Sequence, residues 1–273
     1  MFAKLLVLLG VQAAAAIAAI MAGSRLWLSV RHDKIFCGKV KRPLRVLFFS
    51  DLHGNSRRKM NLDIWKKIDD LPGIDLVVIA GDVIINHASE LLPHLGGIER
   101  LVAKVPVFYI DGNHDVRDYS AVKRLLKRCG VCVLADNKAS LLVDGTKVDI
   151  IGLRDFAFHR YGGGFVAADA AMRRLDADAL NICISHQPQI FDRYTEHSAD
   201  LMLCGHTHAG QVRLPFMPVL FAPNQGVFPK YGYGWYNVNG ARMYVTKGIG
   251  TTWFPIRFWN RPEICVIDIL PHQ

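Results

Sequence analysis

Hydrophobic residues fall into short continuous runs along most of the chain, and amphipathic stretches separate these runs. Runs of this kind are typical of strands that are buried on both faces. Helical spacing marks residues 56–68, 88–103, 118–128 and 166–176. Helices between buried strands, with short connections between the later strands, predict an α/β sandwich with mixed pairing rather than one purely parallel sheet. The strand-like runs are 45–50, 76–80, 105–110, 131–134, 140–143, 148–152, 180–185, 200–204, 241–247 and 264–270.

The N-terminal segment has a different pattern. From Leu5 to Gly23 the only polar side chain is Gln12, and a helix of these 19 residues would be about 28 Å long, enough to cross a bilayer. A secretory signal peptide cleaved near residues 16–18 is the competing interpretation. Against it, Lys4 is the only charged side chain before the run, and the run continues past that point. We expect residues 1–23 to form an uncleaved transmembrane anchor.

The net charge of +9 is concentrated next to this segment. Residues 24–45 carry seven basic side chains and one acidic side chain, whereas residues 46–273 are close to neutral. A basic juxtamembrane linker at 24–45 suits an anionic lipid surface better than nucleic acid, although a solvated linker explains the same charges. By the positive-inside rule, the domain at 46–273 should lie in the cytoplasm, held by one span in the inner (plasma) membrane.

The six cysteines are too few for a disulfide framework in a chain of 273 residues. Cys183 and Cys204 lie in runs that read as buried strands, where a thiol behaves as a small hydrophobic group. Cys129 and Cys132 form a C-x-x-C pair with no second pair after it. We interpret this pair as a helix end leading into a strand rather than as a zinc or redox site.

Polar residues of the metal-ligand type follow each of the early strands. Asp51 and His53 follow the first strand, Asp82 the second, and Asn113 and His114 the third, with 31 residues from Asp51 to Asp82 and again from Asp82 to Asn113. One strand–helix–strand step separates the clusters, so they should meet at the same carboxyl edge of a sheet. A single Asp or His at a strand end is usually an ordinary turn residue, but this ordered series is not expected by chance.

Two later clusters add three histidines. His186 ends one apolar run, and His206 and His208 follow another. Imidazole together with carboxylate is a ligand set for zinc, manganese or iron. Seven ligands are too many for one tetrahedral site, but they fit two metals that share a bridging carboxylate, and paired metals activate water and stabilise displacement at phosphorus.

In this order the motifs resemble those of the calcineurin-like metallophosphoesterases, from about Val46 to the C-terminus. The resemblance implies a four-layer α/β/β/α sandwich and two divalent metal ions, with Mn²⁺ favoured over Zn²⁺, Fe or Co²⁺. It also implies hydrolysis of a phosphodiester or pyrophosphate bond by metal-activated hydroxide. The implied ligands are Asp51, His53 and His208 for one metal and Asn113, His186 and His206 for the other, with Asp82 as the bridge and His114 as the catalytic acid that contacts the phosphate.

One position departs from the family pattern. Many members read Gly-Asp-x-x-Asp, and the second Asp orients the catalytic histidine, whereas this chain has Ile85 at that position. Either Asp51 or a backbone carbonyl must then orient His114, or His114 matters less. The metal-ligand set itself is complete.

A narrower resemblance concerns the segments 205–211, 248–250, 255–257 and 261–263. They look like the membrane-associated bacterial branch, which includes phosphodiesterases and the UDP-2,3-diacylglucosamine pyrophosphatases of lipid A synthesis. It implies a membrane-anchored hydrolase acting on a nucleotide-linked lipid. The alternatives are a phosphodiesterase for soluble nucleotides and, less favoured because no ligand is lost, an inactive binding scaffold.

Two further features concern the substrate. Arg117 and Arg154 are our candidates for phosphate contacts, because arginine binds phosphate through two hydrogen bonds. The segment 214–236 is rich in apolar and aromatic residues, but its prolines and glycines disfavour a helix or a central strand. We expect a loop beside the metals that contacts an amphiphilic phosphate or pyrophosphate substrate at the lipid membrane; the alternative is a satellite core. No nucleic-acid partner is expected, because the domain is nearly neutral.

Overall fold

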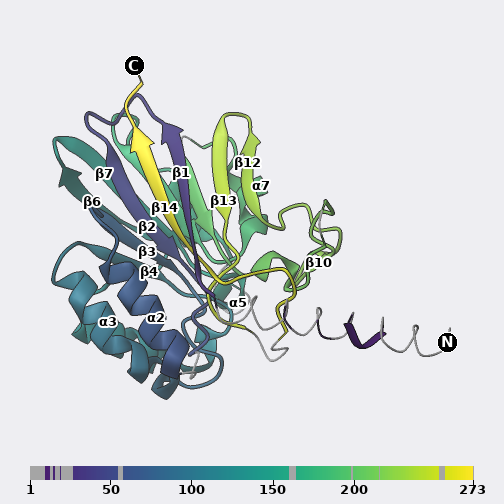
Figure 1. The fold of residues 1–273 in the computed structure, drawn as a ribbon. Helices are drawn as coiled ribbons and strands as arrows, with labels where there is room; N and C mark the ends of the chain where they lie inside the picture. The colour runs from purple at the N-terminus through teal and green to yellow at the C-terminus, as the bar shows by residue number, and fades with distance from the viewer. Residues whose placement is uncertain are drawn as a thin grey trace.

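The body of the protein consists of two six-stranded mixed sheets that pack face to face (Figure 1). The computed structural model describes residues 10–12, 15, 19, 27–54, 58–159, 164–197, 199–214, 216–251 and 256–272, with side chains left out at 58–63. Each sheet has a parallel centre and an antiparallel pairing toward one or both edges. The mixed pairing predicted from the short connections is therefore confirmed.

The first sheet has the spatial order β1 (Ser29–Phe36), β14 (Glu263–Leu270), β2 (Leu44–Phe49), β3 (Leu76–Ala80), β4 (Val107–Ile110) and β5 (Cys132–Val133). Strands β2 to β5 are parallel, as their crossover helices require. These crossovers contain α2 (Arg58–Asp69), the 3₁₀ turn η1 (Ala88–Leu91), α3 (Leu92–Val102), η2 (Asp115–Asp118) and α4 (Tyr119–Arg128).

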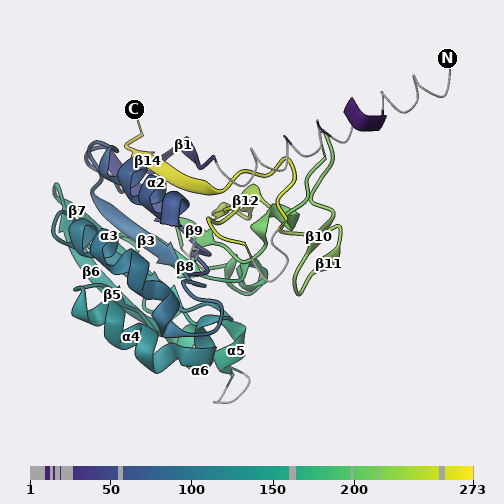
Figure 2. The same cartoon turned by 60° about the horizontal axis from the view of Figure 1, so that its bottom comes forward.

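The second sheet has the order β12 (Gly234–Val238), β13 (Ala241–Val245), β9 (Leu201–Cys204), β8 (Leu180–Ser185), β7 (Thr146–Leu153) and β6 (Asn137–Val143). Figure 2 shows the small β10 (Phe221–Ala222) and β11 (Gly226–Val227) hairpin standing away from the two sheets. The short helical elements of this half are α5 (Phe156–His159), α6 (Val166–Met172), η3 (Pro188–Ile190), α7 (Phe191–Tyr194) and η4 (His208–Gly210).

Three hydrophobic cores separate four layers, as predicted. In β2, Leu47 and Phe49 face the helices α2 to α4, whereas Val46 and Phe48 face the second sheet. A third core lies between the second sheet and the short helices α6 and α7. Because side chains alternate along a strand, a run that is apolar at every position is buried on both faces, which is why the strands were visible as continuous runs.

The segment expected to be a basic linker contributes an edge strand. Residues 29–36 form β1 and pair in parallel with β14, and β2 already begins at Leu44. An edge strand tolerates charge on its exposed positions, so it lacks the continuous apolar run of a central strand. Among the basic residues of this segment that the structure describes, Arg31 pairs with Asp33, Lys39 with Asp200 and Arg45 with Asp268.

The predicted anchor, residues 1–23, lies outside the described residues except for positions 10–12, 15 and 19. Within the part of the chain that the structure describes, no helix combines the length and hydrophobicity that a bilayer span requires. The prediction that Cys129 and Cys132 lie at a helix end leading into a strand is confirmed, because Cys129 directly follows α4 and Cys132 begins β5.

Candidate metal centre

The predicted ligands lie in turns that follow strands of both sheets, and these turns meet at one edge. Asp51 and His53 follow β2, Asp82 follows β3, and His186 follows β8. His206 and His208 follow β9. Six of the seven predicted ligands fall into groups of donor atoms that lie within 4.8 Å of one another, and the seventh, Asn113, lines the same cavity.

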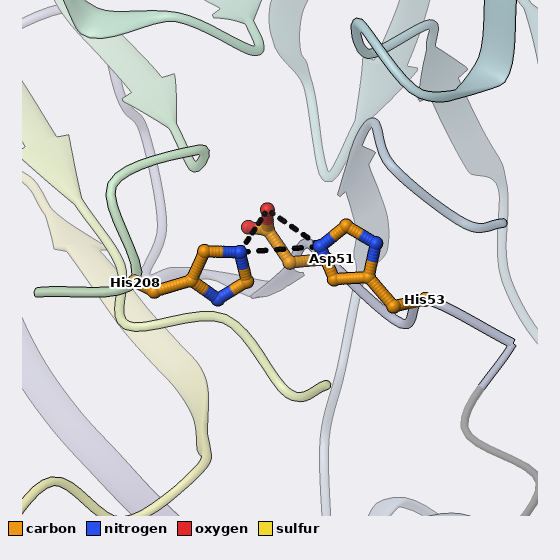
Figure 3. Close-up of side chains that lie close together, drawn as sticks. All are labelled: Asp51, His53 and His208. Atoms are coloured by element: carbon orange, nitrogen blue, oxygen red, sulfur yellow. Dashed lines mark hydrogen bonds and ion pairs between the residues drawn. The ribbon is translucent and has the colours of Figure 1, made fainter. Parts of the chain in front are cut away.

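The first group joins Asp51 and His53 of one sheet to His208 of the other (Figure 3). The Nε2 atoms of His53 and His208 are 3.1 Å apart, and Asp51 Oδ1 lies 3.7 Å from the former and 3.4 Å from the latter. Ligands about 2.1 Å from a tetrahedral ion are about 3.4 Å from one another. The spacing of these three atoms therefore fits ligation of a single ion.

The second group consists of Asp82, His186 and His206. His186 Nε2 lies 3.1 Å from Asp82 Oδ2 and 3.3 Å from His206 Nδ1, which is again the spacing of neighbouring ligands. Asn113 Oδ1 is buried and accepts no hydrogen bond from the described residues. An amide oxygen in this state is an available fourth donor.

Asp82 lies between the two groups. Its Oδ1 accepts a hydrogen bond of 2.8 Å from the backbone amide of His114, which fixes the carboxylate. Its Oδ2 is 3.1 Å from His186 Nε2 and 3.9 Å from His53 Nε2, so it faces a histidine of each group. This is the position that a bridging carboxylate requires.

Contacts outside the groups set the orientation of the donors. His53 Nδ1 lies 3.4 Å from the carbonyl oxygen of Ile84, and His186 Nδ1 lies 2.8 Å from that of Ala80. A ring that donates Nδ1–H to a carbonyl presents the lone pair of Nε2 inward, as a metal ligand must. Asp51 Oδ2 accepts hydrogen bonds from the Ser50 hydroxyl and the His206 amide, whereas its inward Oδ1 accepts none from the described residues.

Burial keeps most of these rings neutral. It lowers the pKa of His53, lowers that of His206 to about 3, and lowers that of His208 well below its ordinary value. His186 is the exception: burial opposes its charge, but Asp82 raises its pKa overall, and the same pairing lowers the pKa of Asp82. Neutral imidazoles and ionised carboxylates are the protonation states that bind a metal, and a divalent ion would displace the proton from His186, so the residues present fit two divalent ions.

The backbone of the site is strained in a way that no sequence pattern revealed. Asp51, Asp82 and His208 have φ angles of 55°, 52° and 49°, in the left-handed region that residues other than glycine rarely adopt. Gly112 allows a close approach beside them, because a Cβ atom there would lie 2.2 Å from Asp82 Oδ1. Such strain is typical of a functional site that the surrounding fold holds in place.

His114 lines the cavity at the metal centre together with Asp82 and Asn113. Its Nδ1 lies 3.2 Å from the carbonyl oxygen of Ile85, so a backbone carbonyl provides the contact for which the family pattern uses a carboxylate. The question left open by Ile85 is thereby answered in favour of the backbone. The His114 ring also lies close to His53 and Asp82, and the ring centres of His53 and His114 are 5.0 Å apart.

Arg257, for which no role was predicted, is fully buried beside the first group. Its Nη2 lies 3.3 Å from His208 Nδ1 and donates to the carbonyl oxygens of Lys247 and Gly250, at 2.9 and 2.5 Å. Gly248, in the loop thus held, packs on Asp51, because a Cβ atom there would lie 2.7 Å from Asp51 Cβ. The only sequence signal was the Pro-Ile-Arg segment of the branch resemblance, which does not specify this contact.

A second set of polar contacts was also missed. The amide of Asn224 lies 3.3 Å from His206 Nε2 and 3.0 Å from Gln187 Oε1. Gln187 Nε2 in turn donates to both carboxylate oxygens of the buried Asp155, at 3.1 and 2.9 Å. This chain of hydrogen bonds connects Asp155 to the β10–β11 turn and, through Asn224, to the predicted metal ligand His206, 18 residues away in the sequence.

The two arginines proposed as phosphate contacts have partners elsewhere. Arg117 is exposed and donates through Nη1 to the Ile85 carbonyl oxygen at 2.9 Å and to the Asn86 side chain. Arg154 donates to Asp111 at 2.9 Å, stacks on Phe158, and lines a different cavity from that of His114. Their role in substrate binding stays a prediction.

The apolar segment 214–236 divides into two halves. Phe216, Met217, Val227 and Phe228 are exposed on and around the β10–β11 hairpin, as expected for a loop. In the second half, Trp235 and Tyr236 lie in the edge strand β12 and pack against the cores of the second sheet, so the loop interpretation was wrong for them. Phe221, which is also exposed, lines the cavity that contains His114.

A four-layer sandwich with histidines and carboxylates clustered at the ends of its strands is the arrangement found in metal-dependent phosphoesterases. The family model for calcineurin-like phosphoesterase matches residues 44–210, which is more than half of the chain. The chain belongs to this family and is a metal-dependent hydrolase.

Individual relatives agree with this assignment. The chain is 31% identical over 242 residues to the uncharacterized metallophosphoesterase YkuE of Bacillus subtilis, covering 82% of this chain and 78% of that protein. It is 25% identical over 249 residues to the phosphodiesterase YaeI of Escherichia coli, covering 88% and 87%. Among solved structures, the 5′-nucleotidase precursor of Thermus thermophilus shares the fold, with a TM-score of 0.51, 17% identity, and coverage of 77% of this chain and 49% of that one.

Proposed function

We propose that the protein is a membrane-anchored hydrolase that cleaves a phosphodiester or pyrophosphate bond in an amphiphilic substrate, such as the nucleotide-linked lipid UDP-2,3-diacylglucosamine. The observation that carries this proposal is the exposed apolar surface next to the metal centre. Phe221 borders the cavity that contains His114 and is itself 54% exposed. Val227 pairs with Phe221 across the β10–β11 hairpin, and Phe216, Met217 and Phe228 are further exposed apolar side chains on and around it that acyl chains would contact.

The residues of the centre divide the chemistry between them. One divalent ion would be held by Asp51, His53 and His208. The other would be held by Asn113, His186 and His206, and Asp82 would bind both ions. Two bound ions lower the pKa of water and neutralise charge that develops on a phosphate. His114, whose Nδ1 contacts the Ile85 carbonyl, would donate a proton from Nε2 to the leaving oxygen when both of its ring nitrogens are protonated. Mn²⁺ is our first choice of metal, with Zn²⁺, Fe and Co²⁺ as alternatives that the same ligands accept.

The membrane part of the proposal rests on the sequence. Residues 1–23 would form one span in the inner membrane, with the catalytic domain in the cytoplasm. The ion pairs of Arg31, Lys39 and Arg45 reduce the charge that the basic segment 24–45 offers to lipid, but Lys34, Lys41 and Arg42 contribute to it as well. A reporter fused at residue 273 should be active only on the cytoplasmic side. A mature protein that begins near Ala19, or an external C-terminus, would refute this arrangement.

The substrate is tested by comparing catalytic efficiency on UDP-2,3-diacylglucosamine and on its deacylated counterpart, in detergent micelles with Mn²⁺. We expect a preference for the acylated substrate that Phe216→Ser and Phe228→Ser reduce. Leu142→Ser is the matched control, because Leu142 is exposed on β6 in the second sheet. Equal efficiency on both substrates would instead favour a phosphodiesterase for soluble nucleotides; the Escherichia coli relative is named a phosphodiesterase, without a stated substrate.

A further inference from the structure

The loop between β3 and η1 provides the carbonyl that contacts His114, and Glu90 holds the end of this loop. Glu90 lies in η1 and accepts hydrogen bonds from three successive backbone amides, those of Ile85 at 2.6 Å, Asn86 at 3.2 Å and His87 at 3.3 Å. Amides in an irregular loop need partners of this kind, because no helix or sheet provides them. One carboxylate therefore fixes the backbone that faces His114.

The peptide group between Ile85 and Asn86 connects Glu90 to His114. Its N–H, on Asn86, donates to the Glu90 carboxylate, and its carbonyl oxygen, on Ile85, lies 3.2 Å from His114 Nδ1. In a planar trans peptide group the N–H and the C=O point in opposite directions, so an acceptor that fixes the N–H also fixes the direction of the carbonyl. The negative charge of Glu90 also polarises this group, which makes its oxygen a better acceptor.

Two further contacts hold this arrangement in place. Arg117 Nη1 donates to the same Ile85 carbonyl oxygen at 2.9 Å, so the oxygen is fixed from the solvent side as well. Gly54, directly after His53, packs on Glu90, because a Cβ atom at Gly54 would lie 2.3 Å from Glu90 Cβ. The turn that carries a predicted metal ligand is therefore in direct contact with η1.

We infer that Glu90 is a positioning residue for His114. The Ile85 side chain has no polar group that could orient the ring, so the orientation comes from the backbone, and Glu90 directs that backbone through the peptide group between Ile85 and Asn86. This inference rests on the proposed function, in which His114 is the general acid, and adds to it the charged group that sets the direction of the acid.

The turnover of two phosphodiesters by the full-length protein loaded with Mn²⁺ tests this inference. Phenol is a poor leaving group that needs a proton from the acid, whereas 4-nitrophenol leaves readily without one. Glu90→Ala should reduce turnover of diphenyl phosphate about tenfold, but that of bis(4-nitrophenyl) phosphate by less than about twofold. KM and metal content should stay near those of the wild type, because Glu90 belongs to neither group of metal donors.

A combined variant shows through which residue Glu90 acts. In the His114→Ala background, Glu90→Ala should reduce turnover of diphenyl phosphate by less than about a further twofold, because a positioning residue has no effect once the group that it positions is absent. Asp118→Ala is the matched control. The Asp118 carboxylate accepts from the Ala88 amide at 2.9 Å, one residue beyond those that Glu90 holds, so its loss should weaken η1 but leave turnover unchanged.

A second variant and a spectroscopic measurement support the kinetics. Glu90→Gln keeps the size of the side chain and one acceptor oxygen but removes the charge, so it should reduce turnover of diphenyl phosphate only about threefold. This variant provides the test if Glu90→Ala does not fold. The ¹⁵N signal of His114 Nδ1, recorded in zinc-loaded protein, should shift in Glu90→Ala and stay unchanged in Asp118→Ala.

The two kinds of measurement separate the possible failures. Wild-type turnover of diphenyl phosphate in Glu90→Ala, or a loss that multiplies with that of His114→Ala, would overturn the role of Glu90. An unchanged Nδ1 signal in Glu90→Ala would refute the positioning whatever the rates. If His114→Ala itself kept wild-type turnover, the acid assignment in the proposed function would fail, whereas the Nδ1 signal would still show whether Glu90 orients the ring.

Discussion

Asp82 is the residue on which both groups of donors converge. Its Oδ1 is fixed by the His114 amide, and its Oδ2 faces His186 and His53. Every other predicted ligand belongs to one side of the centre, with the exception of His53, which groups with Asp82 as well as with Asp51. A change at Asp82 should therefore affect both ions at once.

Replacing Asp82 by Ala should lower the metal content below two ions per chain and reduce hydrolysis of an aryl phosphodiester. The loss should exceed the roughly 10–100-fold that is typical when only an outer partner of a ligand is removed. Elemental analysis and initial rates measure the two effects. Asp176→Ala, at an exposed ion pair with Lys147, is the control. Near wild-type rates in Asp82→Ala would contradict the bridging role.

His114 should behave differently, because we assign it to the substrate rather than to a metal. Replacing it by Ala should reduce turnover by roughly 10²–10⁴-fold, the range for a general acid, while leaving metal content near that of the wild type. The structure makes this a sharp test, since His114 also lies close to His53 and Asp82. A loss of metal in His114→Ala would make it a ligand instead.

The site was predictable to the extent that its residues follow strands. The pattern of a strand followed by a polar ligand-type residue placed Asp51, Asp82 and Asn113 at one edge of a sheet without knowledge of any contact, and it marked His186 as the end of a later apolar run. Arg257 and Asn224 were not predictable in this way, because their roles depend on contacts with His208 and His206 across sequence separations of 49 and 18 residues. The positive φ angles at Asp51 and Asp82 are likewise imposed by packing and have no signature in residue type.

Individual elements were predictable where burial is extreme. The central strands β2, β3 and β8 are buried along nearly their whole length, so their runs are continuous and their positions follow from hydrophobicity. β1 was missed because its exposed edge carries charged residues, and part of its stability comes from pairing with β14, more than 200 residues later. Likewise, the residues of β12 lie between glycines that suggest a loop.

The packing of α2 against α3 creates a pH-sensitive contact away from the metal centre. His94 of α3 is buried, its Nδ1 accepts a hydrogen bond of 3.3 Å from Trp65 Nε1 of α2, and its Nε2 has no partner among the described residues. Burial lowers the pKa of His94 to about 4. As the pH falls below about 6.5, His94 is therefore protonated in the unfolded chain before it is protonated in the folded protein.

Below that pH, the contribution of His94 to stability should decrease as the pH falls toward 4. Lowering the pH from 7 to 5 should reduce the free energy of unfolding by about 2 kcal/mol through the protonation of His94. In His94→Phe this part of the acid sensitivity should be absent, as measured by urea unfolding of metal-free protein at both pH values. His32→Phe, at an exposed position on β1, should keep the wild-type pH dependence. If the free energy of unfolding depended on pH equally in His94→Phe and in the wild type, His94 would not be a source of the acid sensitivity.

At the scale of the whole molecule, the metal centre connects the two sheets. Asp51, His53 and Asp82 follow strands of the first sheet, whereas His186, His206 and His208 follow strands of the second. The sheets also share the hydrophobic core between them, so the molecule does not depend on metal alone for its fold. Ions held by ligands from both sheets should nevertheless stabilise this arrangement, because they bind the folded chain and find no preformed site in the unfolded one.

Removal of metal by a chelator should therefore lower the melting temperature as well as abolish activity. A ligand present at about 1,000 times its dissociation constant stabilises the folded state by about 4 kcal/mol, which for a domain of this size corresponds to a shift on the order of 10 °C. Differential scanning calorimetry with and without Mn²⁺ measures it. Asp82→Ala should show little metal-dependent shift, whereas Asp176→Ala should keep the full shift. If wild-type protein with two bound ions melted at the same temperature as the chelated protein, the ions would not be stabilising the junction of the sheets, and the ligand assignments across that junction would have to be revised.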